Sequence, residues 1–207
     1  SEQIIELMEQ GSTRGVKVMA FPELCLTAYT CSDLFLQESL LREAKKELKR
    51  ILQASKSKDM IIFVGMPWMH KGKLYNVAAV LNRGRILGIV PKKHLPNYSE
   101  FYELRHFNPG MEKVEMTDWE GVQVPMGMNL LFACRTMLEL VLAAELCEDV
   151  WVPCPPSISH ALAGATVIAN CSASDETTGK DQYRYNLICG QSARLVCGYI
   201  YANAGEG

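Results

Sequence analysis

Apolar residues follow two kinds of pattern along the chain, one typical of amphipathic helices and one of buried strands. Over residues 38–54, apolar side chains recur every three or four positions with Lys and Glu between them, which predicts a helix. The short run 16–21 is largely apolar and the run 60–65 is continuously apolar, as is typical of buried strands. Similar patterns predict strands over 74–81, 86–90, 121–125, 138–146, 165–170 and 196–203, helices over 157–163 and 181–194, and a first helix that ends at Gly11.

The order of these segments predicts a mixed α/β fold. Residues 82–85 (Asn-Arg-Gly-Arg) separate two strands and predict a hairpin, whereas helices separate several of the other strands. No long linker, low-complexity tract or internal repeat divides the chain. One domain over residues 1–207 is therefore favoured.

Composition and charge argue against several classes of protein. With 48% hydrophobic residues and a net charge of −2, the 207-residue chain is not expected to be disordered. The absence of a dense Lys/Arg run argues against binding to nucleic acid or to a membrane surface. No apolar stretch reaches the ~18 residues of a transmembrane helix, and no signal peptide is visible. A cytoplasmic protein is expected.

The eight cysteines do not form a metal-binding pattern. None belongs to a CxxC pair, and the four histidines do not cluster with them, so buried reduced thiols are expected rather than a metal site. The chain also lacks the GxGxxG and GxxxxGK[ST] loops that bind nucleotides. Neither a metal nor a cofactor is therefore expected in this chain.

Three potentially reactive side chains each follow a predicted strand: Glu23, Lys92 and Cys147. In α/β sheets, functional groups gather at the carboxyl ends of strands. A carboxylate, an ammonium and a thiol that meet there can serve as base, electrostatic stabiliser and nucleophile. Each residue taken alone is more often an ordinary surface or core residue, so their co-occurrence carries the hypothesis. Lys93 is the alternative to Lys92.

The segments around these residues resemble a known family. They are FPELCLTAYTCSDLF (21–35), VGMPWMHKGKLYNVAAVLNRGRILGIVPKKHLPNYSEFYELRHF (64–107), ELCEDVWVPCPPS (145–157), and GATVIANCSAS to YIYANAGEG (164–207). The chain resembles the nitrilase superfamily of carbon–nitrogen hydrolases and, more closely, the glutaminase domains of glutamine-dependent NAD synthetases. The resemblance implies a nitrilase-like α-β-β-α sandwich. It also implies that this domain is incomplete at both ends, with strands expected before residue 1 and after residue 207.

The resemblance also implies roles for particular residues. The catalytic trio falls on Glu23 as base, Lys92 as stabiliser of the oxyanion, and Cys147 as the nucleophile that forms a thioester. Glu103 matches a supporting glutamate. Tyr98, Phe101, Glu148, Trp151 and Ser174 match positions that line the substrate pocket, although core packing or an ordinary surface place remains the alternative for each.

The activity implied is hydrolysis of the glutamine side-chain amide. The ammonia would serve a synthetase domain, expected outside this chain, that uses ATP and Mg²⁺ to convert deamido-NAD to NAD. Glutamine, that domain and further copies of the chain in a homo-oligomer are the expected partners. Two alternatives remain open, namely a stand-alone amidase or nitrilase acting on another small amide, and a non-catalytic assembly module.

Overall fold

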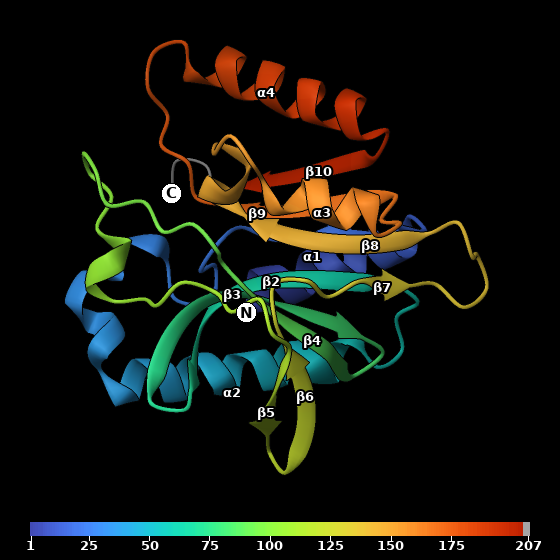
Figure 1. Cartoon of the computed structure of the whole chain (residues 1–207). Helices are drawn as coiled ribbons and strands as arrows, with labels where there is room; N and C mark the ends of the chain where they lie inside the picture. The colour runs from blue at the N-terminus through green and yellow to red at the C-terminus, as the bar shows by residue number, and fades with distance from the viewer. Residues whose placement is uncertain (205–207) are drawn as a thin grey trace.

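The computed structural model describes residues 1–204, whose strands form two β-sheets (Figure 1). The six-stranded sheet has the order β1-β2-β3-β4-β6-β5 and contains β1 (Val18–Ala20), β2 (Ile61–His70), β3 (Lys73–Asn82), β4 (Arg85–Pro91), β5 (Glu115–Trp119) and β6 (Val122–Met126). The four-stranded sheet has the order β10-β9-β8-β7 and contains β7 (Phe132–Ala133), β8 (Val141–Leu146), β9 (Val167–Ser172) and β10 (Gly198–Asn203).

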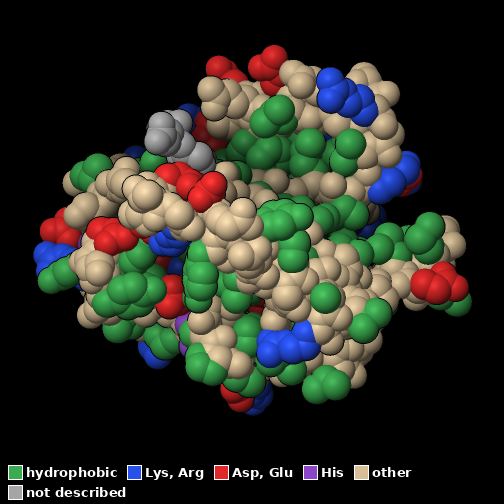
Figure 2. Space-filling view, turned by 90° about the horizontal axis from the view of Figure 1, so that it is seen from above, with side chains coloured by type: hydrophobic (Ala, Val, Ile, Leu, Met, Phe, Trp, Pro, Cys, Tyr) green, Lys and Arg blue, Asp and Glu red, His purple; other side chains and the backbone are tan. Residues whose placement is uncertain are grey.

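Helices connect and cover these sheets. The α-helices are α1 (Glu2–Thr13), α2 (Glu38–Ser55), α3 (Pro156–Leu162) and α4 (Lys180–Leu195), and the 3₁₀ segments are η1 (Tyr29–Leu36), η2 (Glu103–Arg105) and η3 (Cys147–Val150). None of the helices within residues 1–204 is both long and apolar enough to cross a membrane. On the face seen in Figure 2, Lys and Arg side chains are scattered among acidic and hydrophobic ones rather than gathered in one patch.

The two sheets pack face to face between layers of helices. The inner core joins Phe63, Val80 and Val90 of the six-stranded sheet to Leu142, Ala144 and Ala169 of the four-stranded sheet. On the outer face of the larger sheet, α1 and α2 contribute Met8, Leu48 and Ile51 to a core that includes Ile62 and Val64. Helices α3 and α4 lie on the outer side of the smaller sheet (Figure 1). This arrangement confirms the expected α-β-β-α sandwich.

Long periodic segments are predicted well from the sequence. Helix α2 extends one residue beyond the predicted 38–54, and β3 and β4 form the predicted antiparallel hairpin. Strand β2 is longer than predicted and continues through Pro67 to His70. Its partner β1 pairs only with Ile61–Phe63, so the second half of β2 has a neighbouring strand on one side alone. A proline is tolerated at such an edge.

Several short elements differ from the prediction. Helix α1 ends at Thr13 rather than at Gly11. Gly11 is a buried position within the helix, where an added Cβ would lie 2.8 Å from the Met19 side chain. Val16 then donates its N–H to the Gly11 carbonyl, which shortens β1 to three residues. Strands β5 and β7 were not predicted, and β8 begins at Val141 rather than at residue 138.

Gly65 of β2 supports the turn that follows β1. A Cβ at this position would lie 2.3 Å from the Pro22 carbonyl oxygen and 2.7 Å from the Glu23 Cα. The same strand residue accepts the Leu26 N–H at its carbonyl oxygen, at 3.3 Å. The turn that carries Glu23 therefore rests directly on the backbone of β2, and only glycine allows this approach.

We predict that Gly65→Ala lowers the free energy of unfolding by about 3 kcal/mol or more, because the added methyl group meets backbone atoms that cannot move aside. Gly190 of α4 is the matched control, since an added Cβ there meets nothing within 4 Å. Gly190→Ala is expected to stabilise the protein by roughly 0.5–1 kcal/mol. Urea unfolding of both variants measures the difference. Equal midpoints for Gly65→Ala and the parent would contradict the close approach.

Candidate active site

The three predicted catalytic residues converge from both sheets. Glu23 follows β1 and Lys92 follows β4, both in the six-stranded sheet. Cys147 begins η3 at the end of β8, in the four-stranded sheet. The facing sheets thus bring an acid, a cation and a thiol into one buried region between them.

A buried charged cluster forms around Lys92. Its ammonium Nζ lies 2.7 Å from Glu23 Oε1 and 2.5 Å from Glu103 Oε1. The side chains of Lys92 and Glu23 are fully buried, and that of Glu103 is 4% exposed. Asn76 donates its amide to Glu23 at 2.7 Å and to Glu103 at 3.3 Å, and Tyr29 donates its hydroxyl to Glu103 at 2.7 Å. Such pairing is what buried charges require.

The environment of this charged cluster shifts the titration of its members. Burial raises the pKa of the Glu23 carboxyl, and the opposing attraction of Lys92 only partly offsets it. Burial alone would lower the pKa of the Lys92 ammonium, but the charges of Glu23 and Glu103 raise it well above its ordinary value. Lys92 therefore stays charged, while Glu23 accepts a proton more readily than an exposed glutamate would.

Cys147 occupies a constrained position at the start of η3. Its backbone has a φ of +39°, which is unfavourable for a residue with a side chain. The Cys147 N–H donates to Asn170 Oδ1 at 2.9 Å, and its sulfur accepts from Ser172 Oγ at 3.2 Å. Burial, together with the charge of Glu23, raises the pKa of the thiol to about 12. The resting thiol is therefore protonated and needs a base.

Glu23 also contacts the segment that follows β9. The Ala173 N–H donates to Glu23 Oε2 at 3.2 Å. After burial, the charge of Glu23 is the next cause that raises the pKa of the Cys147 thiol, and the Lys92 ammonium lowers it. The base and the nucleophile therefore lie close enough for their charges to interact.

A cavity of about 370 Å³ opens over Cys147. It falls within the range of roughly 300–1,000 Å³ that is usual for small-molecule sites. Its wall includes all five residues expected from the sequence to line a substrate pocket, which are Tyr98, Phe101, Glu148, Trp151 and Ser174. Four further residues of the wall were not expected there, namely Thr178, Gly179, Lys180 and Tyr183.

The wall of this cavity carries both signs of charge between aromatic rings. Tyr98 donates its hydroxyl to the Glu148 carboxylate at 2.9 Å, and burial raises the pKa of that carboxyl. The Lys180 ammonium lies 5.8 Å from the centre of the Phe101 ring and 5.5 Å from that of Trp151, and it forms an ion pair with Asp175. The cavity can therefore receive a small molecule that bears a positive and a negative group.

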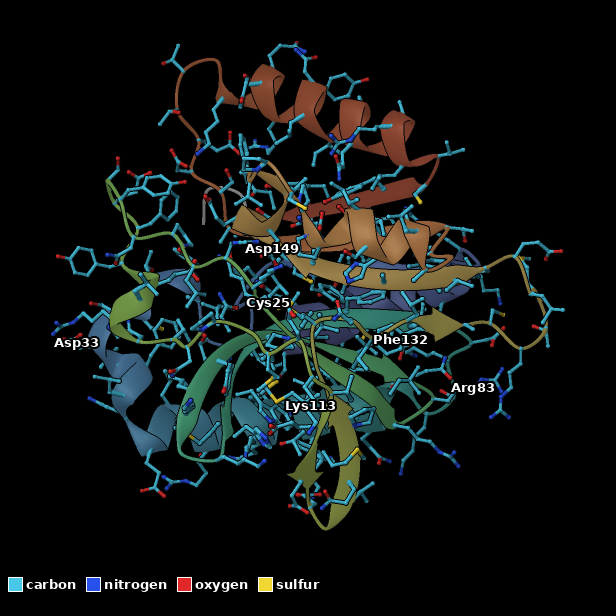
Figure 3. All side chains as sticks on the ribbon, in the orientation of Figure 1. Cys25, Asp33, Arg83, Lys113, Phe132 and Asp149 are labelled. Atoms are coloured by element: carbon cyan, nitrogen blue, oxygen red, sulfur yellow. The ribbon has the colours of Figure 1, made fainter. Side chains whose placement is uncertain are left out.

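Asp149, which is labelled in Figure 3, joins the two segments that carry Lys92 and Cys147. Its buried carboxylate accepts the N–H of Leu146 at 3.0 Å, of His94 at 2.8 Å and of Lys93 at 3.4 Å. Burial, with the nearby charge of Glu145, raises the pKa of Asp149 to about 7. This residue fixes the chain beyond β4 against the start of η3.

Several polar residues of the site were not predicted from the sequence, namely Tyr29, Asn76, Asn170, Ser172 and Asp149. A signal was present for two of them, because Asn76 and Asn170 interrupt strongly apolar strands. Lys92, and not the alternative Lys93, belongs to the charged cluster. The Lys93 side chain is one-third exposed, and its ammonium lies 3.9 Å from Glu112, outside this cluster.

Comparison with known proteins identifies the family. The profile of the Carbon-nitrogen hydrolase family matches residues 2–205. The chain belongs to the carbon–nitrogen hydrolase family. This carbon–nitrogen hydrolase is 41% identical over 204 residues to the glutamine-dependent NAD(+) synthetase of Mycobacterium leprae and 43% identical to that of Mycobacterium tuberculosis. Each alignment covers 99% of this chain and 30% of the relative, so the chain spans about a third of their length.

Solved structures share the fold of this hydrolase. A glutamine-dependent NAD(+) synthetase from Cytophaga hutchinsonii superimposes with a TM-score of 0.87 at 30% identity, over 98% of this chain and 32% of the other. An amidase of the nitrilase superfamily from Nesterenkonia superimposes with a TM-score of 0.73 at 17% identity, over 98% of this chain and 68% of the amidase. The second likeness is one of fold alone.

We predict that Asp149 makes the stability of this hydrolase fall as the pH rises from about 4 to 7. The folded carboxyl has a pKa of about 7, against an ordinary value of 3.8, so the folded state binds more protons than the unfolded state in that window. Asp149→Asn cannot titrate and should flatten this slope. Urea unfolding at pH 5, 6, 7 and 8 measures it, with Asp118→Asn, an exposed aspartate that also accepts a backbone N–H, as control. Parallel pH profiles for Asp149→Asn and the parent would refute the prediction.

Proposed function

We propose that this chain hydrolyses the side-chain amide of glutamine through a thioester on Cys147. The observation that carries the proposal is the buried Lys92 ammonium, held between two carboxylates beside a thiol that opens into a cavity. A base, a cation and a nucleophile in this relation are suited to acyl transfer.

The first half of the reaction forms the thioester. Glu23 takes the proton from the Cys147 thiol, and the sulfur attacks the amide carbon. Lys92 stabilises the oxyanion together with a backbone N–H group. The N–H groups of Leu146 and Cys147 already donate to Asp149 and Asn170. We therefore assign this second donor to the Glu148 N–H. Glu23 then passes its proton to the departing nitrogen, which leaves as ammonia.

The second half releases glutamate. Glu23, ionised again, removes a proton from water, and the hydroxide attacks the thioester carbon. Collapse of this intermediate breaks the carbon–sulfur bond, and the proton on Glu23 returns to the sulfur. Glu103 acts through Lys92, since its carboxylate, with Asn76 and Tyr29, holds the ammonium in place.

The charges of the cavity wall favour an amino acid over a simple amide. The Glu148 carboxylate suits the α-ammonium of glutamine, and the Lys180 ammonium suits its α-carboxylate. Tyr98, Phe101 and Trp151 offer apolar surface to the side-chain methylene groups, and Ser174 offers a hydroxyl at the same wall.

The relatives named above support a further part of the proposal. Both are called glutamine-dependent NAD(+) synthetases, so the ammonia released here would serve the ATP-dependent amidation of deamido-NAD to NAD. ATP and Mg²⁺ would act in a synthetase domain beyond this chain. Assembly into a homo-oligomer and a cytoplasmic location remain predictions from sequence.

We predict that Cys147→Ala lowers glutamate release from glutamine by at least ~10³-fold, because no thioester can form. The fold should persist, since only one sulfur atom is lost. Cys189→Ala, at an exposed free cysteine of α4, is the matched control and should keep the parent rate. Turnover by Cys147→Ala at the parent rate would show that the mechanism is wrong.

We also predict that Lys180→Met and Glu148→Gln weaken the use of glutamine more than that of butyramide, which lacks both charged groups. The loss of one charge-assisted hydrogen bond corresponds to roughly a tenfold fall in kcat/KM for glutamine. Lys180→Met keeps the apolar part of the lysine side chain, and Glu148→Gln keeps a side-chain oxygen that accepts the Tyr98 hydroxyl. Kinetics with the two substrates provide the test, and an equal loss for both would exclude recognition of the amino-acid end.

A further inference from the structure

Two pairs of polar residues approach Cys147 from β9 and β10, on the side of the four-stranded sheet. Asn170 and Ser172 lie two residues apart on β9 and therefore share one face of the strand. Asn170 Oδ1 accepts the Cys147 N–H, and Ser172 Oγ lies 3.2 Å from its sulfur. Each is backed by a tyrosine of β10, since Asn170 donates to the Tyr199 hydroxyl at 3.1 Å and Ser172 lies 2.5 Å from that of Tyr201.

The two pairs differ in what they hold. The Asn170 pair fixes the backbone of Cys147 and ends at Glu145, which accepts the Tyr199 hydroxyl. The Ser172 pair reaches the sulfur itself, which is the reacting atom. Ser172 is fully buried, so its hydroxyl faces protein groups rather than bulk water.

The direction of the hydrogen bonds in the Ser172 pair follows from the number of protons. A serine hydroxyl has one hydrogen, and that of Ser172 points to the Cys147 sulfur. The hydrogen between Ser172 and Tyr201 must then come from Tyr201. The result is a chain of two donors, from the Tyr201 hydroxyl to Ser172 and from Ser172 to the sulfur, in which each bond strengthens the next.

We propose that Ser172 is a further catalytic residue that stabilises the Cys147 thiolate, and that Tyr201 is the positioning residue that orients the Ser172 hydroxyl. This inference rests on the proposed function, because it concerns the same nucleophile. No proton moves along the chain of donors. Glu23 takes the thiol proton, and the two hydroxyls keep theirs while the sulfur carries the negative charge. In agreement, the hydrogen bond from Ser172 lowers the pKa of the buried thiol.

The thiolate population is measured without any substrate. Iodoacetamide alkylates thiolates, and mass spectrometry of the Cys147 peptide separates its labelling from that of the other seven cysteines. At about pH 8, well below the pKa of the thiol, the rate of this labelling is proportional to the thiolate fraction. Ser172→Ala is expected to slow it roughly tenfold, the effect of a lost hydrogen bond to a charged sulfur. Tyr201→Phe should slow it by less. Tyr185→Phe, an exposed tyrosine of α4, is the control and should leave the rate unchanged.

The double variant separates a chain of donors from two independent effects. Because Tyr201 acts through Ser172, the variant with both changes should match Ser172→Ala alone. Rate losses that multiply in the double variant would overturn the role of Tyr201, and an unchanged rate in folded Ser172→Ala would overturn the proposal. If Ser172→Ala does not fold, the labelling rate of Tyr201→Phe decides. Glutamate release is measured separately, so slower labelling of the variants without glutaminase activity in the parent would refute the proposed substrate and leave the donor chain standing.

Discussion

The Lys92 ammonium, buried between Glu23 and Glu103, is the constraint on which the rest of the site depends. Removing one partner from such a buried pair costs about 3–5 kcal/mol, because it leaves an uncompensated charge in the interior. The turn after β1, the chain after β4 and segment η2 must therefore meet at one point. Gly65 permits the close approach of the turn after β1. Asn76 of β3 donates to the carboxylates of both Glu23 and Glu103.

Burial, with the charge of Glu23, keeps the nucleophile protonated at rest. Two carboxylates and one ammonium give the buried charged cluster an excess negative charge, and a thiolate beside it would add another. Transfer of the thiol proton to Glu23 moves the negative charge to the sulfur without increasing the total. The raised pKa of the Glu23 carboxyl makes it a better acceptor for this proton, which partly offsets the raised pKa of the Cys147 thiol.

The sequence was most informative where a pattern was long or a motif was complete. The periodicity of α2 and the hairpin of β3 and β4 were predicted almost to the residue, and the assigned trio and pocket residues do lie together, although their roles remain predictions. Short elements such as β7 carry too few residues to show a period. Asn76, Asn170 and Ser172 escaped notice for another reason. The role of a polar residue in an apolar strand is evident only when its hydrogen-bond partners are known, and those partners lie 23 to 53 residues away.

The site consists of two parts that come from different sheets. The charged cluster belongs to the six-stranded sheet and its loops, whereas the supports of Cys147 belong to β9 and β10. In the described structure β10 is an edge strand that pairs only with β9, with Tyr201 opposite Asn170 and Asn203 opposite Ser172. A register slip of one residue would turn both tyrosines to the other face of the sheet. Loss of this pairing would therefore remove the tyrosines that hold Asn170 and Ser172 in place. The pairing register of this edge strand thus links the packing of the smaller sheet to the chemistry at Cys147.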